Sequence, residues 1–72
     1  MAKTLEEYHR LLRLNPKDAQ LRFELGLLYR ELGEWKKSLR EWQAVIEIDS
    51  NNLPARQAIQ DLLKEYGSEI RL

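Results

Sequence analysis

The stretch AQLRFELGLLYRELGEWKKSLREWQAVIEIDSNN, residues 19–52, decides the fold. Apolar residues recur in it at spacings of three and four on either side of Gly33, and β-branched residues are scarce in the whole chain. This spacing is typical of amphipathic helices, and glycine commonly follows a helix end in the left-handed conformation. We therefore expect helices over 19–32 and 35–48. The loop between them is so short that the two helices must be antiparallel neighbours.

The sequence on each side of this stretch predicts one further helix. Thr4 and Glu7 have the spacing of a capping box, which indicates a helix over 5–14. Asn52 is a suitable N-cap for a helix over 53–66, and a proline is tolerated in its first turn. The chain is thus predicted to be a single all-α domain of four helices joined by loops of two to four residues.

Each helix carries an apolar stripe that we expect to be buried. Because the stripe residues recur every three or four positions, they lie on one side of their helix. The stripes are Leu5, Tyr8, Leu11 and Leu12; Leu21, Leu25, Leu28, Tyr29 and Leu32; Leu39, Trp42, Val45 and Ile46; and Ile59, Leu62, Leu63 and Tyr66.

The chain repeats itself after 34 residues. A shift of 34 places apolar residues on apolar residues and helix breakers on helix breakers through both helices of the period. The matched pairs include Leu5 with Leu39, Tyr8 with Trp42, Leu11 with Val45, Leu12 with Ile46, Leu25 with Ile59, Leu28 with Leu62, and Gly33 with Gly67. A fixed period that contains two helices indicates an α-solenoid, in which helical hairpins stack side by side.

The residues of this period resemble the tetratricopeptide repeat (TPR). The resemblance rests on the segments Leu25-Gly26-x-x-Tyr29, Gly33-x-Trp35 and Ser38-x-x-x-Trp42. The sequence departs from the family pattern at three positions: Arg22 replaces the usual first Trp, Ser38 the small Ala, and Ser50 the Pro.

The resemblance implies one complete repeat flanked by two halves. The complete repeat is 19–52, whereas 5–14 resembles the second helix of a preceding repeat and 53–67 resembles the first helix of a following one, which would cap the stack. The remaining residues, 68–72, form a tail that could fold back or extend the last helix. The expected architecture is a short right-handed stack of TPR type. In it Gly26 allows close helix approach and Trp42 is a buried wedge.

Composition excludes several classes of function. The 72 residues contain 12 Lys and Arg against 12 Asp and Glu, no Cys and one His. Disulfide frameworks and Cys/His zinc sites are therefore excluded, and without excess positive charge we expect no nucleic-acid binding. No apolar run is long enough to span a membrane, and the absence of Cys and of a hydrophobic leader favours the cytoplasm. We expect no cofactor and no catalysis, because the lone His9 lacks a nucleophile or acid partner in the sequence pattern.

The family resemblance implies where a partner would bind. In such repeats the first helix of each pair lines the concave face, so residues there should form a groove for a protein or peptide. These residues are Gln20, Phe23, Glu24, Leu27, Arg30, Glu31, Gln57, Asp61 and Lys64. Phe23 and Leu27 are apolar residues that either face this groove or complete a broad core stripe. Some TPR domains hold C-terminal carboxylates through Lys and Asn at these places. With Leu27 and Phe23 there instead, we expect an apolar or mixed peptide, helical or extended.

A second hypothesis is self-association. Repeat proteins generally need about three repeats to close a core, and this chain has one whole repeat. The outer sides of its first and last helices could therefore drive homo-oligomer formation, through Tyr8, Leu11, Ile59, Leu63 and Tyr66. A third hypothesis is that the chain is a designed or excised repeat unit. The sequence alone does not separate these alternatives.

Overall fold

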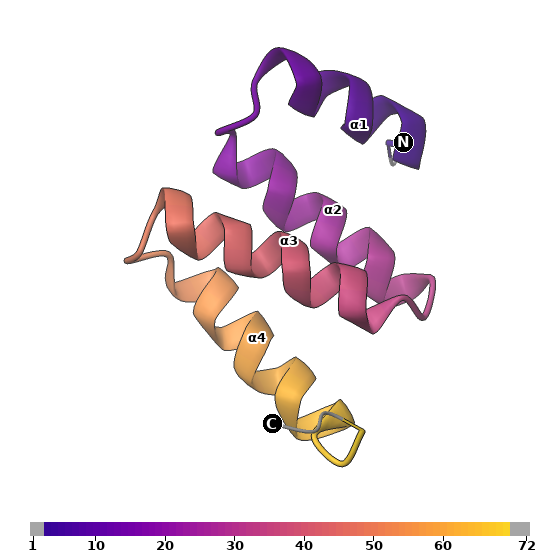
Figure 1. Cartoon of the computed structure of the whole chain (residues 1–72), viewed down its shortest axis with the longest axis vertical. Helices are drawn as coiled ribbons and strands as arrows, with labels where there is room; N and C mark the ends of the chain where they lie inside the picture. The colour runs from indigo at the N-terminus through magenta and orange to yellow at the C-terminus, as the bar shows by residue number, and fades with distance from the viewer. Residues whose placement is uncertain (1–2, 70–72) are drawn as a thin grey trace.

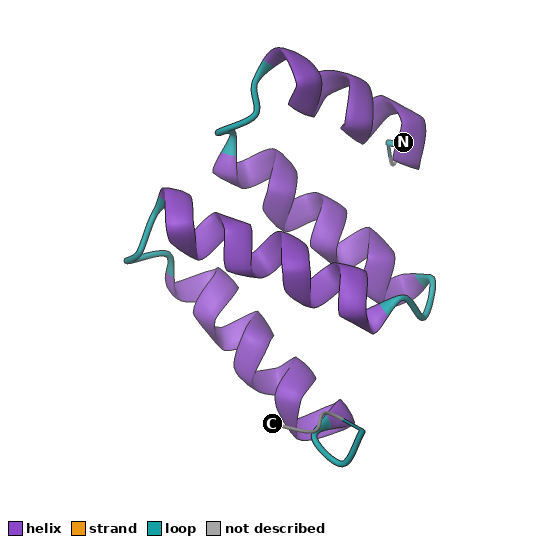
Figure 2. Cartoon of the chain, in the orientation of Figure 1, coloured by secondary structure: helices purple, strands orange, loops and turns teal. Residues whose placement is uncertain are grey.

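Four helices make up the fold. The computed structural model describes residues 3–69, in which α1 (Leu5–Leu14), α2 (Ala19–Glu31), α3 (Trp35–Ile48) and α4 (Leu53–Tyr66) follow one another as successive antiparallel layers (Figure 1). Short loops join them, and the described residues contain no strand (Figure 2). The predicted all-α arrangement of stacked helical hairpins is confirmed.

Local hydrogen bonds set the helix starts. The Glu7 amide donates to Thr4 Oγ1 and the Thr4 amide donates back to Glu7 Oε1, each at 3.2 Å, so the predicted capping box at α1 is formed. Asp18 and Asn52 each accept a bond from the amide three residues further on, at 3.1 and 3.0 Å. These side chains satisfy amides that have no partner inside their helix. α3 begins after Glu34 without a side-chain cap.

The helix ends show one small correction. α2 ends at Glu31, one residue before the predicted end. Gly33 then has φ 79°, the left-handed conformation expected of it. Gly67, its partner under the 34-residue shift, instead has φ −58° and follows the end of α4 at Tyr66. Residues 67–69 form a turn rather than more helix, and the rest of the predicted tail lies outside the described residues.

The tightest packing is between α2 and α3. A Cβ atom on Gly26 would lie 2.6 Å from Cδ1 and 2.8 Å from Cε2 of Trp42, and it would meet Nε1 as well, so only glycine admits the indole. The Trp42 Nε1–H donates to the Phe23 carbonyl at 3.1 Å, and Ser38 Oγ donates to the Gly26 carbonyl at 2.7 Å. Trp42 and Ser38 are wholly buried. The predicted wedge and the predicted close approach are therefore both present.

α1 and α4 pack on either side of this pair. Tyr8 and Leu12 of α1 form one buried cluster with Leu25 and Tyr29 of α2. On the other side α4 packs against α3 and contributes the fully buried Ala55 and Leu62.

Two leucines of the predicted stripes are exposed. Leu32 is 55% exposed because α2 has already ended, and Leu63 is 40% exposed because no described helix covers the side of α4 on which it lies. Periodicity assigns a residue to one side of its helix, but burial also requires a neighbouring element.

Candidate functional site

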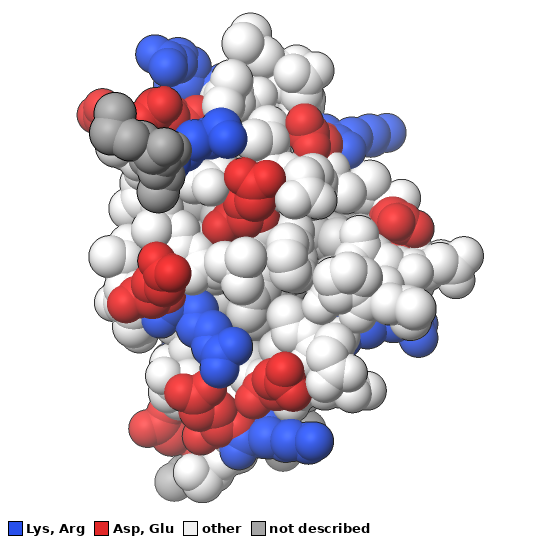
Figure 3. Space-filling view, turned by 180° about the vertical axis from the view of Figure 1, so that it is seen from behind, with Lys and Arg blue, Asp and Glu red and all other residues white. Residues whose placement is uncertain are grey.

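The candidate binding surface lies on α2 and α4. In Figure 1, α3 lies in front of α2. Figure 3 shows the molecule from behind, where uncharged surface lies between small groups of charged side chains. We call this surface the inner face and define it by the predicted groove residues. Their positions on α2 and α4 are Gln20, Phe23, Glu24, Leu27, Arg30 and Glu31, and Gln57, Asp61 and Lys64.

The two apolar residues of the inner face have different environments. Leu27 is 41% exposed and is thus available to a partner. Phe23 is half-buried, and its ring centre lies 6.2 Å from that of Trp42 at an interplanar angle of 32°. Phe23 therefore serves partly as packing for the core indole, whereas Leu27 is an apolar surface residue bordered by charges, as interaction sites commonly are.

Glu24, on the inner face where α2 meets α1, is hydrogen-bonded within the chain. Glu24 accepts hydrogen bonds from Tyr8 Oη at 3.2 Å and from Gln20 Nε2 at 3.1 Å, and Lys3 Nζ lies 3.6 Å from it. Burial of the Tyr8 hydroxyl raises the pKa of that phenol above its usual value of 10.0, and the charge and the hydrogen bond of Glu24 raise it further. Glu24 thereby fixes α1 against α2.

The opposite end of the inner face is closed by an ion pair between helices. Arg30 of α2 and Glu65 of α4 approach to 2.6 Å, which joins the two helices near their ends. Within α4, Gln57 Nε2 donates to Asp61 Oδ1 at 3.1 Å. Because Arg30 and Gln57 already have partners, a ligand would compete with these contacts. Glu31 and Lys64 are exposed at the margin.

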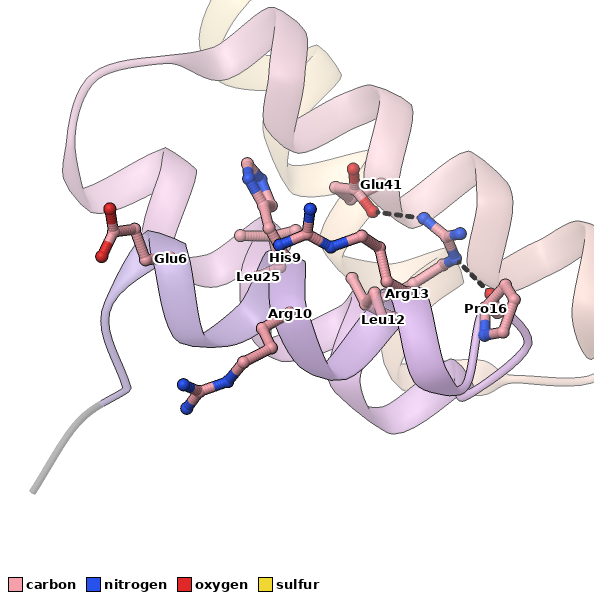
Figure 4. Close-up of a pocket in the computed structure, with 9 residues that line it drawn as sticks. Glu6, His9, Arg10, Leu12, Arg13, Pro16, Leu25 and Glu41 are labelled. Atoms are coloured by element: carbon pink, nitrogen blue, oxygen red, sulfur yellow. Dashed lines mark hydrogen bonds and ion pairs between the residues drawn. The ribbon is translucent and has the colours of Figure 1, made fainter.

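A hollow that the sequence did not predict lies on the other side of α2. It has a volume of about 770 Å³ between α1, α2 and α3 (Figure 4). Arg22 spans it: Nη1 donates to Glu41 Oε1 at 3.0 Å and Nε donates to the Pro16 carbonyl at 2.9 Å. Arg22 stands where the repeat usually has Trp, so a salt bridge and a loop contact replace an aromatic side chain. The unusual residue at that position was the only signal in the sequence.

The groups around this hollow are mostly charged side chains. Arg13 lies across the hollow toward His9, whereas Arg10 points away from Glu41 (Figure 4). His9 is exposed, and its Nε2 is 3.1 Å from Tyr29 Oη. The described residues hold no cluster of His, Cys, Asp and Glu that could bind a metal. Among residues 3–69 there is also no helix with the length and apolar character to cross a bilayer.

The residues predicted for self-association fall into two groups. Tyr8 is only 7% exposed because α2 covers it, and Tyr66 stacks on Trp35 with ring centres 5.3 Å apart and planes at 11°. Both are therefore occupied within the chain and offer little area to another copy. Leu11 and Ile59 are half-buried and Leu63 is exposed, so these three retain surface for a partner.

The stacked antiparallel hairpins define a helical-repeat protein. The family model of the tetratricopeptide repeat matches residues 19–52, which comprise α2, α3 and the loops that bound them. Residues 19–52 are therefore a tetratricopeptide repeat, and such repeats generally mediate protein–protein interaction. The helices before and after the repeat are compatible with two half repeats. No curated protein and no solved structure matches the chain.

Proposed function

We propose that the chain is a non-catalytic interaction module that binds an apolar or mixed peptide, or a partner helix, on its inner face. The observation that carries the proposal is Leu27, which is 41% exposed on the first helix of a tetratricopeptide repeat. A large apolar residue in such a place adds binding free energy when a partner covers it.

The polar surroundings of Leu27 favour a ligand with a mixed surface. Arg30 and Glu65 form a pair on one side, and Glu31 and Lys64 stand free of helix packing at the margin. An apolar side chain of the ligand would cover Leu27 while charged groups at its flanks meet Glu31 and Lys64. Binding interfaces commonly have this arrangement of an apolar centre and a polar rim.

The test is selection of peptides on the purified chain, followed by affinity measurement with the Leu27→Gln variant. Burying a whole leucine stabilises a complex by about 1.5–3 kcal/mol. The exposed two-fifths of Leu27 therefore correspond to about 0.6–1.2 kcal/mol, or about a three- to eightfold loss of affinity. Phe23→Ala is less suitable because Phe23 also packs near Trp42.

Leu32→Gln is the matched control. Leu32 is an exposed leucine too, at 55%, but it follows the end of α2 and lies outside the inner face. Selected peptides should bind this variant with unchanged affinity. Equal losses for both variants, or no loss for Leu27→Gln, would contradict the proposal.

A further inference from the structure

The two ends of the chain are complementary. Under the 34-residue shift α1 is equivalent to α3, and α4 is equivalent to α2. Within the repeat α2 and α3 pack closely, but in residues 3–69 no helix occupies the corresponding place beside α4, nor the corresponding place before α1. We propose that α4 of one copy receives α1 of a second copy in the register in which α2 receives α3, so that copies stack head to tail. This stacking does not depend on peptide binding at the inner face.

Charge complementarity supports this register. Within the repeat, Arg22 of α2 pairs with Glu41 of α3 at 3.0 Å. The shift of 34 relates Arg22 to Arg56 on α4, and Glu41 to Glu7 on α1. The end that would receive a copy thus has the base, and the end that would dock has the acid. A contact between Arg56 of one copy and Glu7 of the next would repeat the existing salt bridge.

The side of α4 that would receive a copy carries apolar residues with incomplete burial. Leu63 and Ile59 are equivalent to Tyr29 and Leu25 of α2, which are 8% and 1% exposed. Leu63 is 40% exposed and Ile59 is half-buried. Leu25 and Tyr29 are buried against α1 and also border α3, since Lys37 Nζ lies 5.7 Å from the centre of the Tyr29 ring. Beside α4, α3 already takes the place of α1, so a second copy would supply the remaining neighbour, and removal of this surface from water favours association.

The docking side of α1 also carries an apolar residue that is less buried than its equivalent in the repeat. Leu11 is equivalent to Val45, which is wholly buried between the helices, yet Leu11 is only half-buried. Leu14, at the end of the same helix, is 73% exposed, and its equivalent Ile48 remains 37% exposed inside the repeat. Leu11 should therefore become buried in the stack, whereas Leu14 should remain at its edge and supplies a control position.

One residue limits how closely the copies approach. Gly26 admits the Trp42 indole, but Gln60 occupies the equivalent position on α4. Tyr8, the equivalent of Trp42, is covered by α2 and bonded to Glu24 within its own copy, so α1 brings no indole to this place. Gln60→Ala would remove the obstructing side chain and should tighten the association. Because the joined surfaces differ from one another, the stack is open and grows with concentration rather than stopping at a dimer.

The decisive experiment is sedimentation of the full chain from micromolar to millimolar concentration, with two charge variants alone and mixed. The wild type should increase in average mass with concentration. Arg56→Glu alone and Glu7→Lys alone should each lose this increase, because each variant brings like charges together in its own stack, with at least about a tenfold weaker association. An equimolar mixture should recover it, because every junction between unlike variants pairs opposite charges.

Matched variants separate docking from folding. Glu7→Gln retains the capping hydrogen bond, so comparing its helix content with that of Glu7→Lys shows whether the lysine variant has lost α1. Leu63→Gln should weaken the stack and Leu14→Gln should not. A wild type that remains monomeric at every concentration would overturn the proposal. So would Arg56→Glu associating as the wild type does, or a mixture without recovery while both variants are folded.

Discussion

Replacing Gly26 by Ala tests the contact on which the fold depends most. The added methyl group would lie 2.6 Å from Cδ1 and 2.8 Å from Cε2 of Trp42, well inside van der Waals contact. The indole has little freedom to withdraw because it is wholly buried and its Nε1–H is bonded to the Phe23 carbonyl at 3.1 Å. We therefore expect α2 and α3 to separate slightly and the variant to be destabilised.

Three contributions determine the size of the effect of Gly26→Ala. Alanine favours the helix over glycine by about 1 kcal/mol. Overpacking a core costs about 1–3 kcal/mol, and an indole N–H that loses its bond inside the protein costs about 1–3 kcal/mol more. The net loss in free energy of unfolding is then about 1–5 kcal/mol, from a total of about 4–11 kcal/mol for a domain of this size. Tm should fall by about 4–40 °C.

The assay is thermal and urea unfolding followed by circular dichroism. In the Trp42→Phe background Gly26→Ala should lower the free energy of unfolding by clearly less, because the part of the indole that collides with the methyl group is gone. The effects of the two substitutions are therefore coupled. Gly33→Ala is the control: Gly33 has φ 79° and open space around it, so only backbone strain of about 1–2 kcal/mol arises, independent of Trp42. A Gly26→Ala chain that melts at or above the wild-type temperature would refute the reasoning.

Three further substitutions probe other contacts. The pKa of Tyr8 is raised in the folded state, so its contribution to stability is fully present below pH about 10.0 and is lost as pH rises through the higher folded pKa. The free energy of unfolding should therefore fall as alkaline pH rises, and Tyr8→Phe should make this fall smaller. Ser38→Ala should cost about 0.5–1.5 kcal/mol in urea unfolding, because it removes the bond to the Gly26 carbonyl while retaining a small side chain. Tyr66→Ala should lower the free energy of unfolding by about 0.5–1.5 kcal/mol in addition to the loss from its buried area, because it ends the stack on Trp35. The amides of α4 should then be less protected from hydrogen exchange.

The parts of the fold that depend on local chemistry were predictable from the sequence. The caps at Thr4, Asp18 and Asn52 need only a side chain three residues before an amide, and all three are present. The wedge at Trp42 and the close approach at Gly26 were predictable because the resemblance to the tetratricopeptide repeat implies both.

The parts that depend on the placement of separate helices were not predictable. Arg30 meets Glu65, 35 residues away, and Arg22 meets Glu41 because α2 lies at a particular angle to α3 and α4. The apolar pattern also could not tell that Leu63 would be exposed, because exposure depends on whether another helix follows. The predicted groove residues stay a prediction, and the hydrogen bonds and ion pairs among them were not predictable.

The two indoles give the chain a pair of built-in optical probes. Trp42 is sealed between α2 and α3, whereas Trp35 is half-exposed and lies against Tyr66 of α4. A collisional quencher such as iodide should therefore reach the second and spare the first. Detachment of α4 would change the emission of Trp35, and separation of α2 from α3 would change that of Trp42. Intrinsic fluorescence can therefore distinguish opening at the α4 end from unfolding of the central hairpin.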